Sequence, residues 1–417
     1  MDTEFKRRKS AVHMYYYQHC SKAKICRQLN CSRPWLDRWL KRYDPDNVGQ
    51  SLSDHKAGPK PKQSTRYWST QIRQQVIEMR QLRTQRDKWP YALIGAAAIH
   101  YELKALNCPE IPPPRTIHRW LVAEGLVKHN LAPSPPRDPK PIPFSQVNAV
   151  NAIQQLDLKG PVYLRGSNQK HYLAVLRDRY SRRCAIEVLR SRESQGITDF
   201  LVESWHWLGI PDYLQMDNAL EFRGSNRYPR SFGRVVRVAI DLNIEPIFNP
   251  PHEPWRNGGV ERQNGFLENH LLTIEHADLP ALRKEAKACQ TACNQTHRLA
   301  GLEGLTPHEV SAQAHLRLLS PTYTQHHASS LPQDKGFVSF VRLIRKSGRI
   351  TLGAKDRFMV DPDLAYTYVL ARVDLAQKTV AILQDNNILT TYDYSADTVG
   401  AWAEDDKEHK TESETNM

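Results

Sequence analysis

Three acidic residues in the second half of the chain have the types and positions that phosphodiester chemistry requires. Asp157 lies near the end of an apolar run, Asp217 follows a second such run, and Glu261 falls in the first turn of an expected helix. Carboxylates that converge repel one another unless a cation neutralises them, and Mg²⁺ prefers hard oxygen ligands. Two such ions about 3.5–4 Å apart activate a water or a 3′-hydroxyl for in-line displacement at phosphorus.

A mixed α/β layer would bring these three residues together. The apolar patterns predict an order of three strands, a helix, a strand, a helix, a strand and a helix. The expected strands are 152–158, 171–176, 184–189, 212–216 and 245–248, and the expected helices are 197–208, 232–242 and one starting at Val260. This is a five-stranded mixed sheet with helices, in which Asp157 lies on the central strand.

The residues around the three carboxylates resemble a known family. The segments are Leu156-Asp157, 216–222 (MDNALEF) and 254–262 (PWRNGGVER), with 294–298 (NQTHR) and 305–309 (LTPHE) further on. They resemble the catalytic core of bacterial insertion-sequence transposases of the DDE, retroviral-integrase-like superfamily, over residues 147–320. The resemblance implies a ribonuclease H-like integrase core in which Asp157, Asp217 and Glu261 are catalytic. It also implies that they bind two Mg²⁺ ions, with Mn²⁺ able to replace them.

Two features depart from the family pattern. Asp217 and Glu261 are separated by 43 residues, more than in retroviral integrases, and Ala219 replaces the usual glycine. Asn218 is expected to orient a metal-bound water or the DNA, or alternatively to cap the strand. Asp178 and Glu221 are spare carboxylates. The remaining DNA-binding candidates near the reaction centre are Arg256, Asn257 and Arg262, which would hold phosphates. A surface salt bridge is the alternative explanation for each of the two arginines.

The front of the chain is strongly cationic. The 417 residues carry a formal charge of +13, and residues 1–146 hold 26 Lys and Arg against 12 Asp and Glu. We expect short helices at 11–19 and 21–29, then a third helix capped by Ser32. This pattern fits a helix-turn-helix whose last helix enters the major groove, or alternatively a charged helix of any small bundle. The predicted DNA-binding residues of this helix are Arg33, Arg38, Lys41 and Arg42.

Residues 67–130 repeat the helical pattern, with Arg115 and Arg119 as outward-facing DNA-binding candidates. Proline-rich and basic composition predicts linkers on both sides of this second helix-turn-helix-like domain. The expected order is a helix-turn-helix domain at 1–45, a basic linker at 46–66, the second helical domain at 67–130 and a proline-rich linker at 131–146. The ribonuclease H-like core at 147–320, a small β-barrel at 333–395 and an acidic disordered tail at 396–417 follow.

The barrel is predicted from alternating apolar residues between 337 and 392. Barrels of the similar transposases help to bind DNA, and five cations could do so here: Arg342, Arg345, Lys346, Arg349 and Arg357. A purely structural barrel is the alternative.

The resemblance, together with the cationic helical front, implies a DNA transposase that binds mobile-element ends and catalyses cleavage and strand transfer. Its expected partners are element ends, target DNA and further copies of the chain assembled on DNA, and the sequence leaves open whether an accessory ATPase takes part. No apolar run approaches the length of a spanning helix, so we expect a cytoplasmic, nucleoid-associated bacterial protein without a membrane partner. The alternatives are a nuclease of the same fold that does not join strands, and a DNA-binding regulator with an inactive core.

Overall fold

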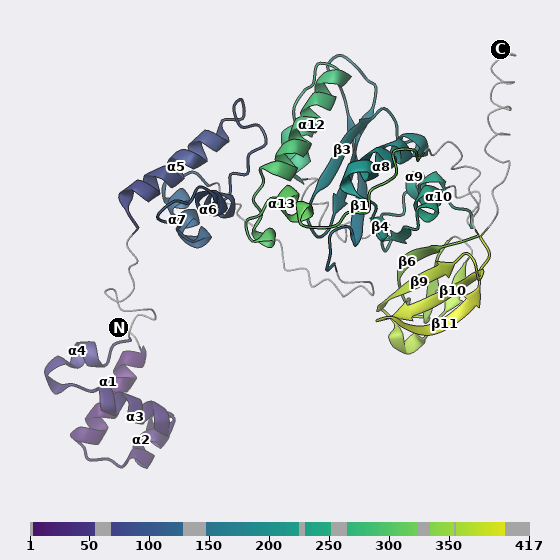
Figure 1. Cartoon of the computed structure of the whole chain (residues 1–417). Helices are drawn as coiled ribbons and strands as arrows, with labels where there is room; N and C mark the ends of the chain where they lie inside the picture. The colour runs from purple at the N-terminus through teal and green to yellow at the C-terminus, as the bar shows by residue number, and fades with distance from the viewer. Residues whose placement is uncertain are drawn as a thin grey trace, which may run out of the picture. The chain divides into compact units, whose positions relative to one another are not determined.

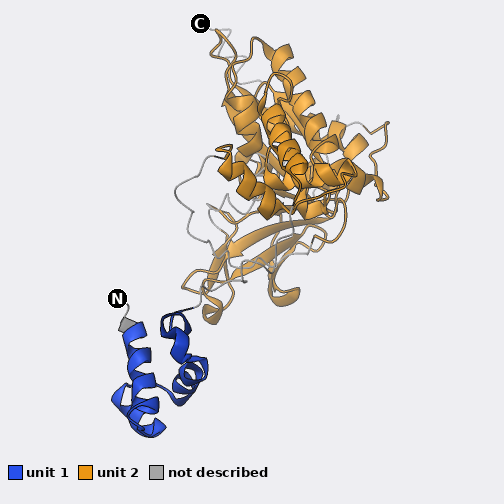
Figure 2. Cartoon of the chain, turned by 90° about the vertical axis from the view of Figure 1, so that its left-hand side faces the viewer, with its two compact units in different colours: residues 1–67 blue, residues 68–417 orange. Residues whose placement is uncertain are grey.

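The chain folds into two compact units, residues 1–67 and 68–417 (Figure 2). The computed structural model describes residues 3–54, 68–127, 147–224, 230–251, 265–323, 334–353 and 356–396. Each unit has at least one apolar core of its own.

The first unit is a small helical bundle. Its elements are α1 (Thr3–Tyr16), α2 (Lys22–Gln28), α3 (Arg33–Arg42), the short η1 (Pro45–Asn47) and α4 (Val48–Ser51). The core includes Ile25, Leu36 and Trp39. Ser21 and Ser32 cap α2 and α3 by accepting hydrogen bonds from backbone amides three residues later. The first helix begins at Thr3 rather than at residue 11, because its charged first turns still supply α1 with core-facing residues such as Phe5.

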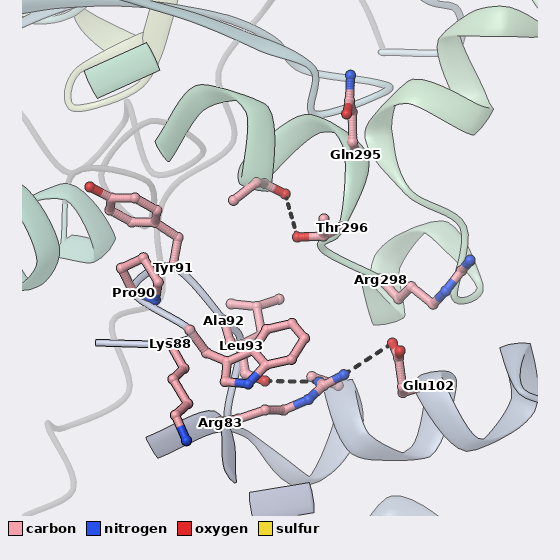
Figure 3. Close-up of a pocket in the computed structure, with 13 residues that line it drawn as sticks. Arg83, Lys88, Pro90, Tyr91, Ala92, Leu93, Glu102, Gln295, Thr296 and Arg298 are labelled. Atoms are coloured by element: carbon pink, nitrogen blue, oxygen red, sulfur yellow. Dashed lines mark hydrogen bonds and ion pairs between the residues drawn. The ribbon is translucent and has the colours of Figure 1, made fainter. Parts of the chain in front are cut away.

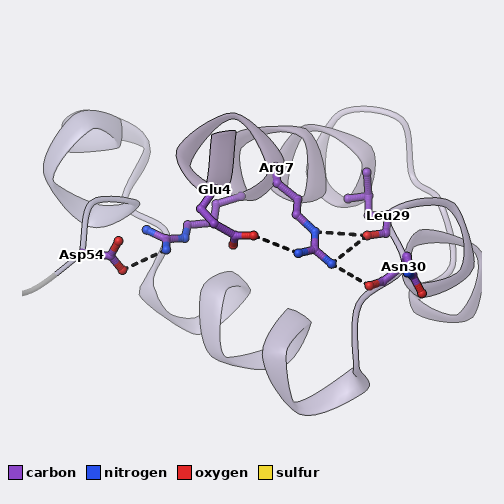
Figure 4. Close-up of polar contacts among 6 residues, drawn as sticks. Glu4, Arg7, Leu29, Asn30 and Asp54 are labelled. Carbon is purple, nitrogen blue, oxygen red and sulfur yellow. Dashed lines mark hydrogen bonds and ion pairs between the residues drawn. The ribbon is translucent and has the colours of Figure 1, made fainter. Parts of the chain in front are cut away.

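Two arginines of α1 form hydrogen bonds that connect it to the other segments of this unit (Figure 4). Arg7 donates to the carbonyls of Leu29 at 3.1 Å and Asn30 at 2.6 Å, after the end of α2. Arg8 is buried, donates to the Leu52 carbonyl at 3.0 Å and pairs with Asp54 at 2.8 Å. The segment 45–52 therefore packs onto the first unit, although we expected a linker to begin at residue 46.

The second unit begins with three further helices that share a core. They are α5 (Thr70–Thr84), α6 (Ala96–Ala105) and α7 (Pro114–Ala123). Val76, Ile99, Ile117 and Leu121 form the centre of this core and are almost fully buried. The expected helical region is therefore present.

A nine-stranded sheet forms the rest of the second unit. Its first five strands have the order β3-β2-β1-β4-β5, with β1–β2 and β2–β3 antiparallel and β1–β4 and β4–β5 parallel. This is the mixed five-stranded layer predicted from the sequence. The strands are β1 (Ile153–Val162), β2 (His171–Asp178), β3 (Cys184–Leu189), β4 (Tyr213–Met216) and β5 (Glu245–Phe248).

Helices cover both faces of this layer (Figure 1). One face packs against α8 (Ser194–Leu208) and α10 (Arg234–Asp241), whose side chains share a core with Leu156 and Met216. The other face packs against α12 (Leu279–Gln295) and against the helical residues 265–267 with the π-helical turn η3 (Glu268–Leu272). Cys289 and Cys293 of α12 lie in this second core.

The edge of the sheet at β3 is closed by side chains of α12. Asn294 accepts a hydrogen bond from the Cys184 amide at 2.9 Å and donates to the Cys184 carbonyl at 2.8 Å. Gln290 accepts from the Ile186 amide at 2.9 Å. These bonds satisfy backbone groups of an edge strand that would otherwise template further pairing. The motif residue Asn294 therefore has a structural role here.

The C-terminal strands extend the same sheet. Strand β6 (Phe337–Leu343) pairs parallel with β5, and β9 (Tyr368–Asp374), β10 (Thr379–Gln384) and β11 (Asn387–Asp393) follow antiparallel. A hairpin of β7 (Arg349–Thr351) and β8 (Arg357–Met359) packs into the same core. Pairing among the described strands does not close a barrel, so the barrel predicted at 333–395 is not confirmed. Alternation identifies half-buried strands but not the sheet that they join.

The remaining short helices are α9 (Leu220–Arg223), η4 (Ala300–Leu302), α13 (Pro307–Ala312) and η5 (Pro362–Leu364). The motif 305–309 forms a capping box at α13, and Arg298 pairs with Glu309 at 3.1 Å. Within the described ranges, every helix is too short or too polar to cross a bilayer.

Candidate active site

Asp157 and Asp217 are adjacent in strand register. The parallel strands β1 and β4 pair Gln154 with Leu214 and Gln155 with Gln215. Two residues further along each chain come Asp157 and Asp217, so the pairing brings two carboxylates that are 60 positions apart in sequence to neighbouring positions. The side chains of Gln155 and Gln215, two residues before the aspartates, are hydrogen-bonded at 2.9 Å. Continued by two residues, this register brings the two aspartates to neighbouring positions in the middle of the sheet, where β4 ends.

Both aspartates follow residues that are buried on the α8 side. Leu156 and Met216 are fully buried in the core that contains α8 and α10. Successive strand residues point to opposite faces, so Asp157 is directed to the other face. That second face is the one covered by α12 and η3.

The chain that follows Glu261 packs on this second face. Lys159, two residues after Asp157, approaches Glu268 of η3 at 3.8 Å. Leu267 and Leu271 share a core with Val175, which pairs directly with Asp157 across β1 and β2. Glu268, which lies on the face that carries Asp157, is seven residues after Glu261 in the sequence.

The environment of Asp217 is poorly suited to an isolated negative charge. Burial raises the pKa of its carboxyl above the usual value, and the nearby Glu221 raises it further. The Ala219 amide, which donates to Asp217 Oδ1 at 2.8 Å, and the Arg192 guanidinium oppose this shift. A carboxylate with a raised pKa beside another acid gains free energy from a nearby cation. The donor set of Asp157 and Asp217, hard oxygens on adjacent strands, therefore fits Mg²⁺.

Several predicted site residues lie outside the described parts of the chain. They are Arg256, Asn257, Glu261 and Arg262. Among the residues that are described, no group of three or more His, Cys, Asp or Glu side chains could hold a metal ion. The predicted set of three carboxylates includes Glu261, so its convergence stays a prediction.

Asn218 makes contacts within the protein. Its amide nitrogen donates to the Asn249 carbonyl at 2.5 Å, and its amide oxygen accepts from Arg342 at 3.0 Å. These bonds tie the loop after β4 to the loop after β5. The neighbouring Ala219 has a φ of −60°, a value that does not require the glycine usual in the similar family.

The two spare carboxylates have different surroundings. Asp178 is fully buried and accepts hydrogen bonds from the amides of Asn151 at 2.9 Å and Ser181 at 2.7 Å, so it stabilises the turn between β2 and β3. It pairs with Gln154, three residues before Asp157 on β1. Glu221 forms an ion pair with Arg192 and contributes to the field at Asp217. Of these two residues, Glu221 is the one close to the candidate site.

The predicted DNA-binding residues of the first unit lie on α3. Arg38 and Lys41 are exposed. Arg33 is exposed and lies 3.6 Å from Asp37 on the same helix. Arg42 donates to the Ser53 carbonyl at 2.8 Å and stacks on the Trp39 ring. Arg38 and Lys41 are therefore the cations of this helix best placed to meet a ligand.

Arg115 and Arg119 are both exposed on α7. The apolar side of this helix, including Ile117 and Leu121, packs into the core of residues 68–127. The opposite side therefore presents the two arginines to solvent, as the helical spacing predicts.

The helices of residues 68–127 are docked on the sheet domain. Tyr91 is buried, donates through its hydroxyl to Glu285 of α12, and receives a 2.7 Å hydrogen bond at its carbonyl from His297. A cavity of about 400 Å³ lies beside this contact. Figure 3 shows Gln295 and Thr296 on one side of it and Arg83 and Glu102 on the other. Neither Asp157 nor Asp217 lines this cavity.

Sequence reasoning missed the environment of Arg342. We expected it to bind DNA from a barrel surface, but it is 4% exposed and bonds to Asn218 and Asn249. A signal was available, because Arg342 is in phase with Val338, Phe340 and Ile344, which are all buried. The other four cations predicted on these strands are exposed: Arg345, Lys346, Arg349 and Arg357.

Comparison with known proteins gives one family match. Residues 242–307 match the family described as "Integrase core domain". This interval includes Glu261, β5 and α12 but neither Asp157 nor Asp217. The chain is an α/β protein in which residues 242–307 are similar to an integrase core domain, and the match covers only a small part of its length. No curated protein matches the chain.

Solved structures with similarity to this chain include viral integrases. The HTLV-2 integrase catalytic core domain in complex with magnesium (trimeric form) is 22% identical, with a TM-score of 0.31, and the match covers 38% of this chain and 95% of that one. The BIV integrase catalytic core is 17% identical, with a TM-score of 0.30 and coverages of 39% and 95%. A simian T-cell lymphotropic virus intasome in complex with PP2A regulatory subunit B56 gamma is 16% identical, with a TM-score of 0.35 and coverages of 74% and 94%.

Proposed function

We propose that this chain is a DNA transposase or integrase that binds the ends of a mobile element and joins them to target DNA. The observation that supports the proposal is the register of β1 and β4, in which Gln155 pairs with Gln215, each two residues before one of the aspartates Asp157 and Asp217. The raised pKa of Asp217 adds support, because it indicates a site where a cation would be favourable.

In this proposal Asp157, Asp217 and Glu261 hold two Mg²⁺ ions, which Mn²⁺ can replace. When bound, these ions supply positive charge at the scissile phosphate and lower the pKa of the attacking hydroxyl. The three carboxylates fix the positions of the charges, and no side chain of the protein acts as a nucleophile.

The joining step exchanges one phosphodiester for another. The 3′-oxygen of the element end forms a bond to a target phosphorus, the bond from that phosphorus to its own 3′-oxygen breaks, and the proton of the attacking hydroxyl is transferred to the oxygen that leaves. One P–O bond replaces another, so the step requires no nucleotide cofactor. Hydrolysis at the element end is the same displacement with water as the nucleophile.

The DNA contacts of the proposal lie mainly on the helical units. Arg33, Arg38, Lys41 and Arg42 of α3 and Arg115 and Arg119 of α7 would bind the element ends, while Asn218, Arg256, Asn257 and Arg262 would act near the reaction centre. Two helical readers would cover a longer asymmetric site than either alone. Because an active site must meet both an element end and target DNA, we propose an oligomer assembled on DNA, acting at the bacterial nucleoid.

A strand-transfer assay tests this proposal. Duplexes that carry an inverted repeat flanking the coding sequence and a pre-cut 3′-hydroxyl are incubated with a target plasmid and Mg²⁺. We expect joined products with the natural chain, and a loss of about 10³-fold or more with Asp157→Asn or Glu261→Gln, while end binding is retained. Asp212→Asn is the matched control, because Asp212 is exposed and lies just before β4.

The outcomes separate the candidate functions. Release of nicked or shortened DNA without joining would identify a nuclease of the same fold. Specific end binding with no metal-dependent chemistry would identify a DNA-binding regulator. Joining by Asp157→Asn at the natural rate would refute the site assignment.

A further inference from the structure

Arg342 is a buried cation without an acidic partner. It lies on β6, is 4% exposed, and forms no ion pair among the described residues. Its guanidinium donates to the carbonyls of Val341 and Thr351, each at 2.9 Å, and to Asn218 Oδ1 at 3.0 Å. Burial, assisted by the charge of Arg223, lowers the pKa of Arg342 to about 9, so the group is still charged at neutral pH. A buried charge whose partners are all neutral costs stability, and such costs are typical of functional sites.

Two of the neutral partners of Arg342, Asn218 and Asn249, are linked to the loop that carries Asp217. Asn218 directly follows Asp217, and its side chain is held between Arg342 and the Asn249 carbonyl. Arg342 also approaches that carbonyl at 3.4 Å. The Asn249 amide donates to Met216, the residue before Asp217, at 3.0 Å. The contacts therefore bracket Asp217 on both sides in sequence.

Asn249 connects the same contacts to the third predicted carboxylate. It is the first residue after β5, on the part of the chain that runs on to Glu261. Through Asn218 and Asn249, a single guanidinium on a C-terminal strand contacts both loops that lead from the parallel strands into the site.

We infer that Arg342 is a positioning residue of the active site, which from the C-terminal strands holds the Asp217 loop and the start of the segment leading to Glu261. This inference rests on the function proposed above. It gives the C-terminal strands a part in catalysis besides any DNA binding. The long-range positive charge of Arg342 also favours the gathering of carboxylates and phosphates nearby.

Two variants break these contacts in different ways. Arg342→Lys keeps the charge but loses the planar fork that reaches several acceptors at once. Asn218→Ala keeps Arg342 and removes only the amide between it and Asn249, at a half-buried position where folding is less at risk.

Arg372→Lys is the matched control. Arg372 lies on β9, pairs in register with Ser339 of β6, and donates to Glu245 at 2.7 Å and 3.2 Å. Glu245 begins β5, whereas Asn249 follows its end. The control therefore alters an arginine of the same sheet at the opposite end of β5 from the active-site loops.

The experiment measures Mn²⁺ binding to the full-length chain by calorimetry, and joining of pre-cut ends as a function of Mg²⁺ concentration. We expect Arg342→Lys and Asn218→Ala to weaken Mn²⁺ binding about tenfold and to raise the Mg²⁺ concentration for half-maximal joining by a similar factor. The DNA affinity of Arg342→Lys should be unchanged, because Arg342 is buried. The double variant should lose little more than either single variant, because both break one network.

Thermal unfolding separates positioning from general stability. Unchanged Mn²⁺ affinity in the folded Asn218→Ala variant would overturn the inference, as would an equal loss in Arg372→Lys. If both variants weaken Mn²⁺ binding but the natural chain never joins DNA, the proposed function fails and the positioning role of Arg342 stands.

Discussion

The surroundings of Asp217 shift the pKa of its carboxyl in opposite directions, and the net shift should make the stability of the fold depend on pH. Burial and Glu221 raise the pKa of Asp217, while the Ala219 amide and Arg192 lower it. The net effect is a pKa above the usual value of an aspartate. A group whose pKa is higher in the folded than in the unfolded state is destabilised in its ionised form. The cost is present at neutral pH and disappears as the pH falls below the unfolded value, about 3.9.

Asp217→Asn should therefore unfold at a higher temperature than the natural chain at pH 7 without divalent ions, by about 1–3 °C. The difference should shrink towards pH 4, where the aspartate of the natural chain becomes protonated. Mg²⁺ should raise the unfolding temperature of the natural chain and leave that of Asp217→Asn nearly unchanged. Thermal unfolding monitored by circular dichroism from pH 4 to 8 checks this, and a lower unfolding temperature for the variant at pH 7 would contradict it.

Residue-level prediction worked where strand pattern and position agree. The apolar runs ending near Asp157 and Asp217 predicted strands that are present and adjacent. The prediction for Arg342 was wrong, because its charge was taken to mean that the side chain is exposed. Arg342 alternates along the strand with buried residues on the same face, such as Phe340. The contacts of Asn218 were beyond sequence reasoning, since its partners Asn249 and Arg342 are 31 and 124 positions away.

At the scale of elements, the pairing of β5 with β6 joins the five-stranded layer to the C-terminal strands. Ile247 and Phe248 pair with Ser339 and Phe340, and the two phenylalanine rings stack with their centroids 5.1 Å apart. Both rings are almost fully buried in one continuous core. The sheet and the C-terminal strands should therefore unfold together.

Phe340→Ala should lower the free energy of unfolding by about 3–5 kcal/mol, because it leaves a cavity against Phe248. Ile388→Ala, at a position of β11 that is 64% exposed, should change it by less than about 0.5 kcal/mol. Urea unfolding followed by hydrogen exchange in peptides from β1 and β10 tests the coupling. Two separate transitions, with only β10 affected by Phe340→Ala, would instead indicate an independent C-terminal domain.

The sequence predicted the strands of the five-stranded layer, but it did not predict that the C-terminal strands join the same sheet. β3 and β5 were predicted with the bounds observed, because each is a short apolar run between clear turn signals. The alternation between 337 and 392 predicted strands but also a barrel, since a period of two does not encode which sheet a strand joins. At the other end of the chain, the charged first turns of α1 concealed a helix that begins at Thr3.

At the scale of the whole molecule, charge is distributed unevenly. The excess of Lys and Arg lies in residues 1–146, and residues 147–417 hold 32 Lys and Arg against 33 Asp and Glu. Counter-ion release by cations that neutralise phosphates makes DNA affinity fall with salt. The proposed function therefore predicts that the helical units dominate this dependence.

Arg38→Gln with Lys41→Gln should reduce the slope of log K against log salt by about 2, since each exposed cation is expected to neutralise one phosphate. Lys6→Gln with Lys9→Gln removes the same charge from exposed positions of α1 and should change the slope much less. Fluorescence anisotropy with end DNA at several salt concentrations measures both. Equal slopes for the two variants would remove α3 from the DNA interface.

The docking of residues 68–127 through Tyr91 has a consequence for where DNA would be cut. If α7 reads a sequence in the major groove while Tyr91 stays bonded to Glu285 and His297, the reader and the sheet move as one body. The number of base pairs between the recognised sequence and the broken bond would then be constant, as if measured with a ruler. Element ends with base pairs inserted in that interval should be bound normally and processed poorly.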